Sequence, residues 1–145
     1  MYTVQTRVTF EAAHRLYDVD TYSKECSDSV HGHSYAVTIV VGREDLNDAG
    51  MVIDFKLLKK VIKEVIEDQY DHSLILRTCD PLLAAFAKLA PEQKMNVTTE
   101  SPTAEWMAES FASLLSCRFA LEDDELRVQS VSVQETENNI ATWRA

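Results

Sequence analysis

Three of the four histidines in this 145-residue chain lie within twenty residues, and their spacing is suited to binding a metal ion. His31 and His33 occupy positions i and i+2 of a strand-like segment, so their side chains project from the same face. His14 ends the preceding strand-like segment on its apolar face. If the two strands are neighbours, three imidazoles converge and leave a fourth position open, as in a catalytic zinc site. The alternative is two exposed histidines at a strand start and an unrelated third one, and spacing alone leaves both open.

Cys26 and the Asp71-His72 pair could supply acid–base chemistry. Cys26 lies five residues before His31 in a polar segment. It is either a thiolate favoured by a nearby metal cation or a loop thiol without a role. Asp71 directly precedes His72, and a carboxylate beside an imidazole can orient it as a proton shuttle near neutral pH. The simpler alternative for His72 is an imidazole favoured by the dipole at a helix end.

Three further acidic residues could have either a binding role or a purely structural one. Glu135 shares the parity of Val131 and Val133, which predicts a carboxylate on an apolar strand face. Burying it costs free energy unless it is paired, so it either binds a ligand that carries N–H donors or reaches solvent at the strand end. Asp54 and Glu105 lie near predicted helix starts, where acidic residues more often cap a helix than form a site.

Strands are predicted on both sides of the histidines. Residues 2–14 and 31–41 alternate with a period of two, and residues 126–134 do so again before a final hairpin strand through Trp143. Residues 15–30 are polar and aperiodic, so we expect a loop there.

Helical periodicity marks three other segments. Residues 55–68 are amphipathic, and residues 81–90 form a shorter apolar segment. Ser101-Pro102 predicts a helix start, with Ser as the cap and Pro at the first helical position, and this helix continues to about Cys117. The first strands adjoin without a helix between them. The predicted fold class is therefore α+β, an antiparallel sheet with two main helices packed on one face, in a single domain over residues 1–145.

Composition limits the partners. Lys and Arg total 14 against 24 Asp and Glu, which gives a formal net charge of −10. Because a chain with this negative charge repels phosphate backbones and anionic membranes, we expect neither nucleic acid nor a membrane as partner. Three cysteines without close pairing do not indicate a disulfide framework. No apolar run has the length of a signal peptide or a membrane span. We expect a soluble, cytoplasmic protein.

Motifs spread over nearly the whole chain resemble the family of 6-pyruvoyltetrahydropterin synthase and 6-carboxy-5,6,7,8-tetrahydropterin synthase. They are, in order, Phe10-Glu11-Ala12-Ala13-His14-Arg15-Leu16, Cys26, His31-Gly32-His33-Ser34-Tyr35, Val52-Ile53-Asp54-Phe55, Asp71-His72, Pro102-Thr103-Ala104-Glu105 and Gln134-Glu135-Thr136. Each motif is short, but the ordered set is specific. The resemblance implies the T-fold (tunnelling fold), a four-stranded antiparallel sheet with two helices on one face. It also implies bound zinc and a homohexamer of two trimers with active sites at subunit interfaces.

The resemblance assigns a role to each matching residue. The residues that correspond to zinc ligands are His14, His31 and His33. Those that correspond to the catalytic thiol and its proton-relay partners are Cys26, Asp71 and His72. Those that correspond to pterin-binding positions are Glu135, as the anchoring carboxylate, with Thr103 and Glu105. The implied substrate is 7,8-dihydroneopterin triphosphate.

The expected product within this family is 6-carboxy-5,6,7,8-tetrahydropterin, made for queuosine biosynthesis. Alternatives are 6-pyruvoyltetrahydropterin, formed with elimination of triphosphate, and 6-hydroxymethyldihydropterin, formed by a folate-pathway variant. The five-residue separation of Cys26 from His31 matches neither the queuosine nor the biopterin branch, and Glu25 resembles a glutamate used in the folate branch. An alternative of another class is a non-catalytic pterin-binding T-fold protein. Cys26 together with Asp71-His72 argues against it, since a binding protein needs no acid–base pair.

Overall fold

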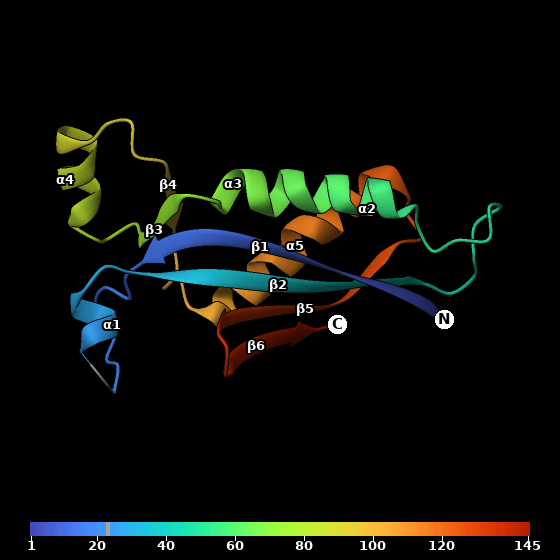
Figure 1. The fold of residues 1–145 in the computed structure, drawn as a ribbon, viewed down its shortest axis with the longest axis horizontal. Helices are drawn as coiled ribbons and strands as arrows, with labels where there is room; N and C mark the ends of the chain where they lie inside the picture. Colours follow the sequence, from blue (N-terminus) through green and yellow to red (C-terminus); the bar gives the residue numbers. More distant parts are fainter. Residues whose placement is uncertain (23) are drawn as a thin grey trace.

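The computed structural model describes residues 1–22 and 24–145. Its centre is one six-stranded sheet with the strand order β4-β3-β1-β2-β5-β6. The strands are β1 (Tyr2–His14), β2 (His31–Arg43), β3 (Ser73–Arg77), β4 (Met95–Thr98), β5 (Arg127–Thr136) and β6 (Asn139–Arg144). Figure 1 shows β1 and β2 as the long central pair, with β5 and β6 beside β2.

Two long helical segments lie side by side along the sheet (Figure 1). The first is continuous and consists of α2 (Phe55–Ile62), a π-helical segment η1 (Lys63–Glu67) and α3 (Asp68–Tyr70). The second is α5 (Ala104–Glu122), and two shorter helices are α1 (Glu25–Asp28) and α4 (Leu82–Leu89). Asp54 caps α2, since its Oδ1 accepts a hydrogen bond from the Lys56 amide at 2.6 Å. The predicted α+β class with two main helices on one sheet face is confirmed.

The antiparallel register of β1 and β2 sets which residues meet at the end of the sheet. His14 lies opposite His31, and Ala12 lies opposite His33. Along β1 the residues Phe10, Ala12 and His14 are buried, whereas Glu11 between them is exposed on the other face. The predicted alternation is therefore confirmed, and all three histidines belong to the face that the helices cover.

The prediction of a four-stranded antiparallel sheet was wrong in strand number. β1, β2, β5 and β6 form that antiparallel set, but β3 pairs parallel with β1 and β4 pairs parallel with β3. β3 has five residues, of which the first four are all buried, so it shows no alternation. β4 has only four residues. Such short segments carry too few positions for a period to be recognised.

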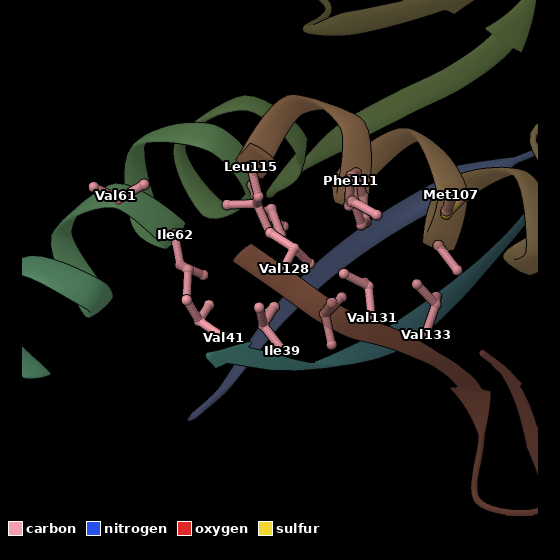
Figure 2. Close-up of a cluster of buried hydrophobic side chains, with 14 of the residues drawn as sticks. Ile39, Val41, Val61, Ile62, Met107, Phe111, Leu115, Val128, Val131 and Val133 are labelled. Atoms are coloured by element: carbon pink, nitrogen blue, oxygen red, sulfur yellow. The ribbon is translucent and has the colours of Figure 1, made fainter. Parts of the chain in front are cut away.

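The core lies between the helices and the sheet. Figure 2 shows Met107, Phe111 and Leu115 of α5 directed at the valines of β5. The buried side chains in this layer that are labelled there are Ile39, Val41, Val61, Ile62, Met107, Phe111, Leu115, Val128, Val131 and Val133. Burying one such side chain contributes about 1.5–3 kcal/mol, so this layer fixes the helices over the histidine face of the sheet.

Helix boundaries differ from the sequence prediction at α5. Its N-cap is Thr103, whose Oγ1 accepts a hydrogen bond from the Trp106 amide at 3.1 Å, rather than Ser101. Pro102 stays outside the helix because its carbonyl accepts a hydrogen bond from His14. The helix also runs on to Glu122, past the predicted end near Cys117. The segment predicted as a loop contains the short helix α1. Among the described residues, no helix combines the length and the apolar character that a membrane crossing requires.

Candidate active site

Three imidazoles converge where β1 ends and β2 begins. The ring centroid of His14 is 4.6 Å from that of His31 and 5.1 Å from that of His33. One ligand nitrogen from each ring lies within 4.8 Å of the others. The β1–β2 register creates this cluster directly, because it places His14 opposite His31 and two residues beyond Ala12, which faces His33. The convergence predicted from spacing is confirmed.

Backbone carbonyls fix the protonation of two of these rings. His14 Nδ1 lies 2.8 Å from the Pro102 carbonyl oxygen, and His31 Nδ1 lies 3.0 Å from that of Ser29. A carbonyl oxygen only accepts, so each Nδ1 must carry the proton and donate it. In the neutral ring the remaining nitrogen, Nε2, is left with a lone pair. These two Nε2 atoms are 3.0 Å apart.

Burial favours the neutral form of His14 and His33. His14 is 1% exposed, and its burial lowers its pKa to about 4, with smaller contributions from the neighbouring His31 and His33. The pKa of His33 is also lowered, again mainly by burial. Neutral imidazoles are the form that binds metal ions. Near pH 7 the buried rings are therefore ready to act as ligands without first losing a proton.

The donor set fits a divalent metal. His33 Nε2 is buried and forms no hydrogen bond with any described residue. Facing lone pairs on His14 and His31 repel each other unless a cation lies between them. Tetrahedral zinc with Zn–N bonds of 2.0–2.1 Å separates its ligand nitrogens by about 3.4 Å, compared with 3.0 Å between the Nε2 atoms of His14 and His31. The three histidines could thus hold one metal ion and leave a coordination position for water or substrate.

Glu135 lies at the rim of the cluster, on the apolar face that its parity predicts. Its Oε1 is 3.3 Å from His14 Nε2 and 3.5 Å from His33 Nε2. The Tyr35 hydroxyl donates to the same oxygen at 3.5 Å, and burial together with this carboxylate raises the pKa of Tyr35. Glu135 keeps 24% of its side chain exposed, so the carboxylate remains reachable by a ligand. Sequence analysis missed Tyr35, although it shares the parity of His33.

Asp71 and His72 interact, as predicted, beside the edge of β1 that pairs with β3. Asp71 Oδ2 lies 2.9 Å from His72 Nδ1, and Asp71 Oδ1 accepts a hydrogen bond from the Glu11 amide at 2.9 Å. These two bonds, the amide first, lower the pKa of Asp71. His72 is 80% exposed and lines a shallow depression of about 360 Å³ together with residues that include Glu11, Ser34 and His33. The pair is therefore solvent-exposed beside β1, at a depression that one histidine of the cluster also reaches.

Cys26 is half-buried in α1, in the segment that joins β1 to β2. Its carbonyl accepts a hydrogen bond from the Leu16 amide at 2.9 Å, which ties α1 to the end of β1 (Figure 1). Ser29, which follows α1, holds His31 through its carbonyl. The thiol is not a member of the three-residue ligand cluster, and it lies in α1, which precedes β2.

The two remaining predicted site residues lie at the start of α5. Thr103 caps this helix, and Glu105 is exposed in its first turn. The preceding Pro102 carbonyl holds His14, so the helix start borders the histidine cluster. The sequence could not predict the roles of this carbonyl and of the Ser29 carbonyl, because every residue type provides a backbone carbonyl.

The comparisons with known proteins agree with this geometry. The chain matches the family described as 6-pyruvoyl tetrahydropterin synthase over residues 3–145. The 6-carboxy-5,6,7,8-tetrahydropterin synthase of Rickettsia felis is 35% identical over 102 residues, which are 70% of this chain and 71% of the relative. The protein of the same name from Aquifex aeolicus is 31% identical over 154 residues, with 93% of each chain covered. A solved structure of an uncharacterised protein from Wolinella succinogenes has a TM-score of 0.83 at 23% identity, covering 99% of this chain and 97% of that chain.

Fold and family together define the class. The sheet with its paired helices is the T-fold, here with six strands, and tetrahydropterin synthases are lyases. This chain belongs to the 6-pyruvoyl tetrahydropterin synthase family. The resemblance that its motifs carry is therefore confirmed.

Replacing one ligand should remove the metal. We expect wild-type protein to purify with about one metal ion per chain and His31→Ala to fall below about a tenth of that, because two imidazoles are a poor site. Elemental analysis by mass spectrometry after extensive dialysis measures this content. His72→Ala is the matched control, because its imidazole lies outside the cluster, and it should keep the metal. Full metal retention by His31→Ala would contradict the ligand assignment.

Proposed function

We propose that this protein is a zinc-dependent lyase that converts 7,8-dihydroneopterin triphosphate to 6-carboxy-5,6,7,8-tetrahydropterin. The observation that carries the proposal is the cluster of His14, His31 and His33, three convergent imidazoles with an open side. Relatives that align over most of this chain are named for this product. The same residues in the same order carried the family resemblance of the sequence.

The proposed zinc ligands are His14, His31 and His33. When bound, zinc polarises hydroxyl and carbonyl oxygens of the substrate side chain, which acidifies the adjacent C–H bonds. Cys26 acts as the base that takes a proton from carbon, and His72, oriented by Asp71, returns one. The depressed pKa of Asp71 keeps its carboxylate charged near neutral pH, as the orienting partner of an imidazole must be. One water molecule is consumed to supply the second carboxyl oxygen, and acetaldehyde and triphosphate leave as the other products.

Binding of the pterin is assigned to the start of α5 and the end of β5. Glu135 is the proposed anchor, because a carboxylate accepts N–H bonds from the guanidine-like edge of a pterin. Its exposed fraction and its position at the rim of the histidine cluster support this role. Thr103 and Glu105 border the same rim and are proposed as further pterin contacts.

The active site is proposed to form between subunits. Among the described residues, the exposed His72 imidazole forms no hydrogen bond with a histidine of the cluster, and Asp71 binds the Glu11 amide instead. A neighbouring copy that presents its own pair to the cluster would supply this contact. We therefore propose a homohexamer of two trimers with composite active sites.

The setting proposed for this activity is queuosine biosynthesis in the cytoplasm. Cys26, Cys79 and Cys117 are free thiols in the structure, as is usual in a reducing compartment. The partner is a small-molecule substrate.

The product of the reaction tests the function. Incubation of the zinc-loaded protein with 7,8-dihydroneopterin triphosphate should yield 6-carboxy-5,6,7,8-tetrahydropterin and acetaldehyde, both measured by mass spectrometry. Triphosphate loss without acetaldehyde would indicate the pyruvoyl product instead. Cys26→Ala should keep zinc while turnover falls about 100-fold or more, the usual scale of an acid–base group. A wild-type rate in that variant would remove Cys26 from the mechanism, and Glu25→Gln tests its neighbour in the same assay.

Glu135→Gln separates pterin binding from metal binding. The amide keeps the size of the side chain but loses the charge that attracts N–H donors, so we expect the Kd for a pterin to rise about 10-fold or more. Zinc content should stay at the wild-type level, since the three histidines suffice as ligands. Isothermal titration and elemental analysis measure the two effects. Loss of zinc with unchanged pterin affinity would instead make Glu135 a metal ligand.

Mixed oligomers test the composite site. His31→Ala and His72→Ala proteins should each be inactive, but co-expressed subunits that assemble at random should regain about a quarter of wild-type activity. This fraction follows because a site needs an intact cluster from one subunit and an intact pair from its neighbour, each with a probability of about one half. Activity is measured on mixed oligomers purified through two different tags. Mixed oligomers without activity would contradict the arrangement.

A further inference from the structure

The turn that carries Asp71 and His72 is held by side chains from two neighbouring strands. A helix ends with carbonyl groups that have no partner inside the helix, and α3 ends at Tyr70 just before this turn. Lys94 Nζ donates to the carbonyl oxygens of Asp68, at 2.7 Å, and of Asp71, at 2.9 Å. Asn96 Nδ2 donates to the Gln69 carbonyl oxygen at 2.9 Å. Side chains of the β4 region thus satisfy three carbonyls at and beyond the helix end.

Ser73 completes this set. Its Oγ donates to the Tyr70 carbonyl oxygen at 2.6 Å and accepts a second hydrogen bond from Asn96 Nδ2 at 2.9 Å. Every carbonyl from residue 68 to residue 71 therefore accepts a hydrogen bond from a side chain. These hydrogen bonds hold the backbone of the turn at the end of α3.

The turn needs this support because His72 has a strained backbone. Its φ of 56° lies in the left-handed region, which costs a residue other than glycine about 1 kcal/mol or more. On the β1 side, the His72 amide donates to the Glu11 carbonyl at 2.7 Å, and the Glu11 amide donates to Asp71. The pair is thus held between β1 on one side and the Lys94–Asn96 region on the other.

The segment between β3 and β4 brings these side chains into place. β4 pairs parallel with β3, with Met95 opposite Leu74, and the Leu74 amide donates to the Lys94 carbonyl at 2.9 Å. The intervening helix α4 has no buried residue, and Figure 1 shows it projecting from the end of the sheet. Because α4 contributes little to the core, the main structural effect of the segment between β3 and β4 is to bring the chain back beside the turn at residues 70–73.

We infer that Lys94 and Asn96 are positioning residues that hold the Asp71-His72 pair in its catalytic geometry. Neither residue contacts the histidine cluster in the described chain, and both act through the backbone of the turn. The inference rests on the proposed proton-transfer role of the pair. It assigns a role to the segment between β3 and β4, which contains none of the motifs that carry the family resemblance.

Lys94→Met tests the inference, because methionine keeps the length of the side chain and loses its three donors. We expect kcat with 7,8-dihydroneopterin triphosphate to fall about 10-fold, since small misplacements of catalytic groups are costly, while KM stays within about 2-fold. Lys94→Arg retains donors and charge and should recover most of the rate. Lys88→Met on α4 removes an equal charge from an exposed position and should match wild type. Asn96→Asp, which loses the amide donor, should lower kcat in the same direction as Lys94→Met.

A readout independent of turnover is the titration of the Asp71 carboxyl group by NMR. In the wild type, the Glu11 amide, His72 and the Lys94 charge hold the pKa of Asp71 below its usual range. Loss of the Lys94 charge and loosening of the turn both weaken the stabilisation of the carboxylate, so the pKa should rise in Lys94→Met and return toward the wild-type value in Lys94→Arg. Amide hydrogen exchange of Glu11 should become faster in Lys94→Met for the same reason.

The outcomes separate the two proposals. Wild-type kcat in Lys94→Met, with Asp71→Asn inactive, would overturn the positioning role and leave the proposed function intact. Full turnover in Asp71→Asn and His72→Ala would overturn the catalytic role of the pair and, with it, the positioning role in catalysis. An unchanged Asp71 titration and unchanged Glu11 exchange in Lys94→Met would overturn the inference whatever the assay shows.

Discussion

The antiparallel pairing of β1 with β2 is the interaction on which the site depends. Because His14 and His31 are register partners, and His33 lies two residues further along the same face, the backbone ladder itself brings three imidazoles together. A shift of one residue would turn one strand's histidines to the opposite face and destroy the cluster. The apolar residues on the same strands prevent this shift, since it would also expose Phe10, Tyr35 and Val37, which are buried under the helices.

The same sheet also provides two different environments for the chemistry. The covered face has the low polarity that keeps His14 neutral with a pKa of about 4. The charged Asp71 and the exposed His72 lie beside β1 instead. Metal ligands benefit from burial, which disfavours their protonation, whereas a proton relay needs access to solvent and to a charged partner. One sheet thus supplies both a buried and a solvent-exposed environment.

The sequence was informative where a pattern is long or a residue type is rare. Thirteen-residue strands show their alternation, and four histidines in 145 residues make a cluster conspicuous. It was uninformative for β3 and β4, which are short, and for the Pro102 and Ser29 carbonyls, which any residue could provide. The predicted start of α5 was wrong because Ser101-Pro102 is locally a good signal for a helix start. In the structure, the hydrogen bond from His14 to the Pro102 carbonyl favours a start at Ala104.

At position 72, the backbone conformation favours glycine, whereas the proposed function requires an imidazole. A glycine would adopt its φ of 56° without strain and would end α3 as glycine commonly ends a helix. Glycine has no imidazole, however, so a chain that keeps His72 at this position must accept the strain. That strain persists only if neighbouring groups over-determine the turn. The Glu11 backbone on one side and the Lys94, Asn96 and Ser73 side chains on the other provide this constraint, and only the return of the chain in β4 makes two of them available.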